Sequence, residues 1–125
     1  MFNRQIELFT KFIQANATEV LGQIENPGEY TPKMICLWIS HACEKPDPSA
    51  KSQFDRERQN RTWSHAEKMR AAVSFLYGHQ LKRGREPYIE DSTGQWKGNP
   101  VLSHEVSQYM KSLRRRKVSN SAMRW

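Results

Sequence analysis

The chain has 125 residues, the length of one domain, and combines 37% hydrophobic residues with a net charge of +7. Residues 1–50 carry 4 Lys and Arg against 6 Asp and Glu, whereas residues 51–125 carry 16 against 7. No segment reaches the roughly 18–20 apolar residues of a membrane-spanning helix and no signal-peptide pattern opens the chain, so we expect no membrane partner and instead a polyanion at the basic half.

Helical spacing of apolar residues predicts a first helix over residues 4–25, which Asn26-Pro27-Gly28 ends. A second helix is predicted from a cap at Thr31, followed by proline at the first helical position, to Glu44. Its expected inner face is formed by Met34, Ile35, Trp38, Ile39 and Ala42.

Cys36 and Cys43 lie on the second helix, about 10 Å apart along its axis. That separation exceeds the roughly 7 Å between the Cα atoms of a disulfide. We therefore interpret both as buried small residues in a reducing compartment, the cytosol or nucleus. Lys45-Pro-Asp-Pro48 ends the helix, and the charged, weakly periodic residues 49–60 predict a loop.

The third helix has a start signal in Ser64-His-Ala-Glu67, which matches a capping box, with Thr62 as an alternative cap. Its expected inner face is formed by Ala66, Met69, Ala72, Val73, Leu76 and Tyr77. Either Gly78 or Gly84 ends it. The segment 86–98, rich in Gly and turn residues, predicts an irregular connection or a small hairpin.

Asn99-Pro100 repeats the pattern of a cap followed by proline and predicts a last helix to Val118. Its apolar positions are Leu102, Val106, Tyr109, Met110 and Leu113. Because helical segments follow one another without a sustained alternating strand, we expect an all-α domain over residues 1–118, with 119–125 as the start of a linker or disordered tail.

Nothing in the sequence predicts catalysis. The four histidines, His41, His65, His79 and His104, have no partners at zinc-ligand spacing. The chain also has no Gly-rich phosphate loop, no nucleophile elbow and no carboxylate pair in an apolar setting. We therefore expect a protein that is not an enzyme and that uses neither a metal nor a cofactor.

A basic run, residues 111–117, contains five cations at the end of the last helix. Lys and Arg bind phosphate through their charge, and Arg also grips two oxygens with its planar fork. On this helix a polar stripe opposite the apolar positions consists of His104, Gln108, Lys111 and Arg115, flanked by Arg114. The other candidate DNA-binding residues are Arg61, His65, Lys68, Lys82, Arg83, Arg85, Lys97, Arg116 and Lys117, and Arg56 and Arg58 lie in a loop nearby.

The basic residues are also compatible with roles that need no duplex DNA. The helix macrodipole favours cations at a C-terminus by about 0.3–1 kcal/mol each, which accounts for one or two of them. A solvated face or a surface for an acidic protein partner is one alternative. A single-strand or RNA binder is another, and it would use exposed rings. Trp38 is predicted in the core, whereas Trp63 and Trp96 either pack inward or face a ligand.

Two segments resemble a known family: Thr62-Trp-Ser-His-Ala-Glu-Lys-Met-Arg-Ala-Ala-Val-Ser-Phe-Leu-Tyr-Gly78, and residues 98–118. Together they resemble the N-terminal, SAM-like core-binding domain of tyrosine recombinases (the phage-integrase class), most closely the crypton-like, transposon-derived versions of fungal genomes. The resemblance implies an orthogonal bundle of four to five helices that clamps one side of a DNA duplex. The DNA contacts that it implies come from His65, Lys68, Gln108, Lys111, Arg114 and Arg115.

In that family the catalytic residues for DNA recombination belong to a separate domain, so the resemblance implies a chain that binds DNA and does not cut it. We therefore expect a nuclear DNA-binding module, part of or derived from a tyrosine-recombinase-like protein. It would hold double-stranded DNA mainly through phosphates, and a homo-oligomer on DNA is compatible with the sequence.

Overall fold

The computed structural model of the chain describes residues 2–16, 24, 26–44 and 61–122. Within them, the structure has four α-helices and one two-stranded hairpin. The elements are α1 (Asn3–Asn16), α2 (Thr31–Cys43), α4 (Trp63–Phe75), the π-helical segment η2 (Leu76–Gln80), β1 (Ile89–Glu90), β2 (Trp96–Lys97), the 3₁₀ helix η3 (Pro100–Leu102) and α5 (His104–Ala122). The all-α prediction is confirmed.

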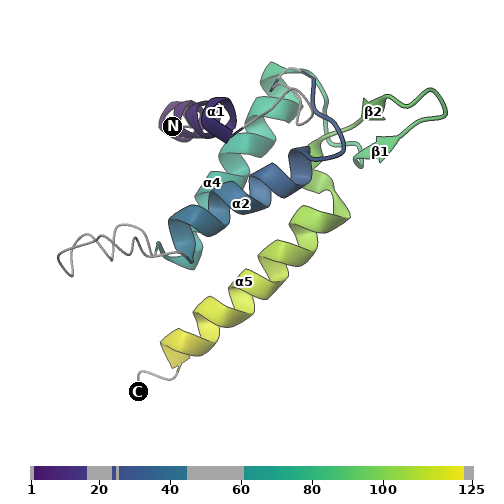
Figure 1. The fold of residues 1–125 in the computed structure, drawn as a ribbon. Coiled ribbons are helices and arrows are strands. Elements are labelled where there is room, and N and C mark those ends of the chain that lie inside the picture. The colour runs from purple at the N-terminus through teal and green to yellow at the C-terminus, as the bar shows by residue number, and fades with distance from the viewer. Residues whose placement is uncertain (1, 17–23, 25, 45–60, 123–125) are drawn as a thin grey trace.

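Helix α2 lies at the centre of the arrangement, in contact with α4 and α5, and α1 contacts α4 (Figure 1). Helix α5 begins near the hairpin and runs along the molecule to the opposite end. The hairpin itself projects away from the helices. No helix among the described residues is long and apolar enough to cross a membrane.

The core combines residues of all four helices, and the apolar faces that periodicity predicts for α2 and α4 form a large part of it. All predicted inner residues of the third helix, which the structure divides into α4 and η2, are buried, and so are those of α2 except Ala42, which is half-buried. Trp38 is 5% exposed, and its ring meets the edge of Phe9 from α1 at a centroid distance of 5.1 Å. Trp38 is thus a core residue, as predicted. Cys43 is buried and Cys36 half-buried, and both are free thiols.

The start of α2 is one residue earlier than predicted, and of the two caps predicted for the third helix the alternative one, Thr62, is confirmed. Tyr30 precedes the first turn of α2, and Thr31 lies inside the helix, where its Oγ1 accepts a hydrogen bond from Gly28 N at 2.8 Å. In α4 the alternative cap is used: Thr62 Oγ1 accepts from His65 N at 3.2 Å. Ser64 is therefore a helical residue and not the first residue of a capping box.

Neither of the two predicted glycines ends the third helix. After Phe75 the backbone widens into η2, and Leu81 N donates to Leu76 O at 2.9 Å. The chain then turns at Gly84, whose φ of +67° favours glycine. The small hairpin is confirmed, with Ile89 opposite Lys97, and Tyr88 Oη next to it donates to Gly28 O at 2.7 Å.

The last helix begins later than predicted. Asn99 Oδ1 caps η3 by accepting from Val101 N at 3.0 Å, and Ser103 Oγ caps α5 by accepting from Val106 N at 3.2 Å. Because η3 breaks the periodicity, Val101 is buried and Leu102 is 44% exposed, so the prediction of Leu102 on the inner face is wrong.

Two further predictions concern the ends of helices. Helix α1 is described to Asn16, and Ile24 lies in a turn, so the prediction of a helix over residues 4–25 is wrong at Ile24. Helix α5 extends to Ala122, beyond the predicted end at Val118. The predicted loop 49–60, with Arg56 and Arg58, lies outside the described residues, as do 17–23 and 123–125.

Candidate nucleic-acid interface

The basic run divides between two sides of α5. Arg116 Nε lies 2.5 Å from Glu44 Oε1, and Lys117 Nζ donates to Cys43 O at 2.6 Å. Both cations therefore attach α5 to the C-terminal end of α2, where a positive charge also interacts favourably with the helix dipole. Lys111, Arg114 and Arg115 are exposed on the rest of the helix surface.

Glu44 is the centre of this attachment. Its Oε2 accepts a hydrogen bond from Tyr109 Oη at 2.6 Å, while Oε1 pairs with Arg116. Burial acts to raise the pKa of Glu44, but the hydrogen bonds from Tyr109 and Arg116 outweigh it and hold that pKa below its ordinary value. Burial, followed by Glu44 itself, raises the pKa of Tyr109, so the phenol stays a neutral donor. The cluster is structural, and two cations of the predicted site belong to it.

The remaining cations of the run form an open basic surface. Lys111, Arg114, Arg115 and Val118 line a shallow hollow of about 410 Å³. Among the described residues, no carboxylate lies within ion-pair distance of these three cations. We call the exposed side chains on this side the outward face of α5; they are His104, Gln108, Lys111, Arg114 and Arg115. All residues of the predicted polar stripe are exposed, as predicted.

A second basic group lies at the start of α4. Arg61 and Lys68 are exposed, and His65 between them is half-buried. Burial lowers the pKa of His65, and the charges of Arg61 and Lys68 lower it further, so all three lie close together. Arg61 N donates to Ala42 O at 3.0 Å, which places this group at the same C-terminal end of α2 that holds α5. The structure thus brings the α4 group and the basic run to one end of the molecule.

The predicted loop cations lie elsewhere, around the hairpin. Arg83 is half-buried, and its Nη1 donates to Trp96 O at 3.1 Å and to Gly98 O at 3.2 Å. Lys97 pairs with Asp91 at 3.4 Å. Lys82 and Arg85 are exposed. These four residues are not brought together with the basic run, since α5 starts beside the hairpin and carries the run to its other end (Figure 1).

The rings that could have stacked on bases are engaged in the fold. Trp63 is half-buried against the core. Trp96 is half-buried too and stacks on Tyr88 with ring centroids 4.9 Å apart. Among the described residues, no group of three or more His, Cys, Asp or Glu side chains is placed to hold a metal ion. Burial raises the pKa of Cys36 to about 12 and that of Cys43 to about 11, which makes both poor nucleophiles.

Sequence reasoning missed Val118 as part of the hollow and Glu44 as the partner of the run. Val118 could have been found, because it lies one helical turn beyond Arg114 and Arg115. The partner of Arg116 could not, because Glu44 is 72 residues away. No family model, curated protein or solved structure matches this chain.

Proposed function

We propose that this chain binds double-stranded DNA without catalysis, mainly through phosphate contacts from the outward face of α5 and the group at the start of α4. The observation that carries the proposal is that some cations of the basic run contact the end of α2, whereas the others do not. Arg116 and Lys117 fix the helix, and Lys111, Arg114 and Arg115 are presented on it without a carboxylate partner among the described residues.

A fixed helix with aligned cations suits a regular array of phosphates. Three cations within one and a half turns span about 6 Å along α5, the scale of neighbouring phosphates on one strand. Like charges so close together repel each other and cost a few tenths of a kcal/mol per pair in the free protein. A polyanion relieves that repulsion, which favours a nucleic-acid ligand over a purely solvated surface.

The packing of the tryptophans favours duplex over single-stranded DNA or RNA as the main ligand. Single-strand binders rely on exposed aromatic platforms, whereas Trp63 and Trp96 are both half-buried and packed. The likeness of residues 62–78 and 98–118 to the core-binding domain of tyrosine recombinases belongs to the same proposal, as does a nuclear location.

The test is a fluorescence-anisotropy titration of a random-sequence 25-base-pair duplex and of its single strand over a series of salt concentrations. If three cations of α5 with Arg61 and Lys68 neutralise about five phosphates, the log–log slope should be roughly −4 to −5. Duplex binding with such a slope supports the proposal. A chain that binds neither form at low salt contradicts it and leaves an acidic protein as the partner of the basic face.

A further inference from the structure

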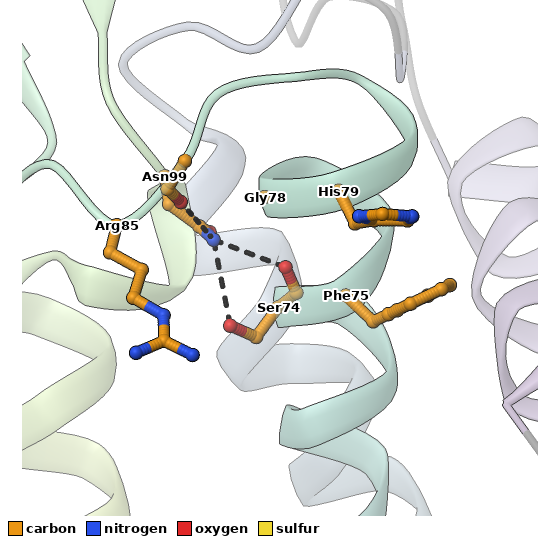
Figure 2. Close-up of a pocket in the computed structure, with 7 residues that line it drawn as sticks. Ser74, Phe75, Gly78, His79, Arg85 and Asn99 are labelled. Atoms are coloured by element: carbon orange, nitrogen blue, oxygen red, sulfur yellow. Dashed lines mark hydrogen bonds between the residues drawn. The ribbon is translucent and has the colours of Figure 1, made fainter.

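A second hollow, of about 340 Å³, lies at the other end of α5, between the end of α4 and the loop that follows η2. Figure 2 shows Phe75 and His79 side by side along α4 and η2, with Arg85 on the other side of Ser74. Gly78 and Gly84 also line it and contribute no side chain to the hollow. The volume is within the range of small-molecule sites.

The wall of this pocket is preformed. The Asn99 side chain is 1% exposed, and its Nδ2 donates to Ser74 O at 3.2 Å and to Gly84 O at 3.3 Å. Its Oδ1 caps η3 at the same time. Asn99 therefore joins α4, the loop and η3 through its side chain, and a ligand would not have to order these segments.

The groups that face the pocket suit an aromatic anion. The rings of Phe75 and His79 are stacked, with centroids 5.0 Å apart and an interplanar angle of 28°, and His79 is exposed. Arg85 is exposed, and among the described residues no carboxylate lies within ion-pair distance of it. A planar ring can extend the stack at His79 while an anionic group reaches the guanidinium.

We propose that this pocket holds one unpaired nucleotide of a bound nucleic acid, with its base on the His79 ring and its phosphate at Arg85. The inference rests on the proposed function, because DNA bound to the outward face of α5 would supply the nucleic-acid strand that leads to the pocket. That face begins at His104, and Asn99 reaches it through η3. A base inside a duplex is covered on both faces by its neighbours, whereas an unpaired base has a free face that can stack on His79.

The experiment compares a blunt 25-base-pair duplex with the same duplex carrying three unpaired nucleotides, on either the 5′ or the 3′ end. Since stacking one base on an aromatic ring is worth at least a factor of about five, one overhang should bind the intact chain at least that much more tightly. The variants His79→Ala and Arg85→Ala should lose this gain and keep the affinity for blunt DNA. The control Lys82→Ala, an exposed cation in the same loop but not in the pocket, should keep it.

Equal affinity for blunt and overhanging duplexes overturns the inference, even where both bind tightly. If no duplex binds, the proposed function itself fails, and a titration with thymidine monophosphate then decides about the pocket. Changes in the His79 ring resonances at millimolar nucleotide, absent in Arg85→Ala, support a nucleotide site. Unchanged resonances overturn it.

Discussion

Arg116 and Glu44 join the last helix to the second one across 72 residues of sequence, with Nε and Oε1 2.5 Å apart. Arg115, the preceding residue, lines the basic hollow instead. One helical step of about 100° thus separates a cation that stabilises the fold from one that is offered to a ligand. The two roles can be separated by mutation.

The triple variant Lys111→Ala, Arg114→Ala, Arg115→Ala should lose DNA affinity and keep its stability. Three fewer phosphate contacts lower the magnitude of the salt slope by roughly 2.7. The urea midpoint of unfolding should change little, since exposed side chains away from the core contribute within about 0.5 kcal/mol. Anisotropy and urea denaturation measure the two effects.

The matched control is the double variant Arg116→Ala, Lys117→Ala. It removes two neighbouring cations but also the attachment to α2, so we expect a loss of about 1–2 kcal/mol in the free energy of unfolding. The salt slope should fall by much less than in the triple variant. If both variants reduce the slope per cation equally, the division of the basic run into two roles is wrong.

Glu44 should make stability depend on pH in the acidic range. Its pKa is lower in the folded chain than its ordinary value of 4.5, so the folded state holds the carboxylate more strongly. Its contribution is fully present above about pH 4.5 and is lost as the pH falls through the folded value. Urea denaturation of the intact chain and of Glu44→Gln should therefore differ most near neutral pH and converge at low pH. A difference that stays constant down to pH 3 would contradict this role.

Much of the fold follows from local pattern. The inner face of α4 and η2 could be predicted because burial on a helix repeats every three to four residues, from Ala66 in α4 to Tyr77 in η2. Helix starts were less predictable, since Thr62 and Ser64 both have a hydroxyl that can cap. Only the backbone geometry selects Thr62, whose Oγ1 reaches His65 N.

The candidate site was predictable in composition, and its division into two sets of cations was predictable only in part. Arg116 and Lys117 lie one turn after Leu113, which places them next to the apolar side of α5 and indicates contacts with the rest of the fold. Their partners are at the end of another helix, so no local pattern identifies them. The same holds for Arg83, whose acceptors Trp96 O and Gly98 O exist only once the hairpin forms.

His65 should report DNA binding through its own titration. Burial and then the charges of Arg61 and Lys68 lower its pKa in the free chain below the ordinary 6.5. The unfolded chain takes up the proton on His65 more readily than the folded chain. The contribution of His65 to the free energy of unfolding is therefore fully present above pH 6.5 and declines as the pH falls below that value. A phosphate beside Arg61 and Lys68 offsets their repulsion, so the pKa of His65 should rise in the DNA complex.

NMR titration of the His65 ring, with and without duplex, measures this effect. Lys68→Ala serves as the control, because removing one of the two charges should raise the pKa of His65 in the free chain. The same pKa in free and bound protein would remove the start of α4 from the interface, while leaving α5 in place.

Gly98 should be among the positions least tolerant of a side chain, and Gly94 provides its control. Both have positive φ, +91° and +86°, so alanine at either carries the strain of a left-handed backbone, about 1–2 kcal/mol. At Gly98 an added Cβ would also lie 2.1 Å from Pro87 O and 2.7 Å from Glu86 O, whereas at Gly94 it meets nothing within 4 Å.

The obstacle at Gly98 is backbone and cannot rotate away, so the segment beside the Arg83 contacts must shift. We therefore expect Gly98→Ala to lower the free energy of unfolding by at least about 2 kcal/mol more than Gly94→Ala in urea denaturation, since clashes of this kind fall in the large tail of mutational effects. Equal costs for the two variants would mean that the backbone of Glu86 and Pro87 moves away from Gly98 without cost, and the base of the hairpin would then not be rigid.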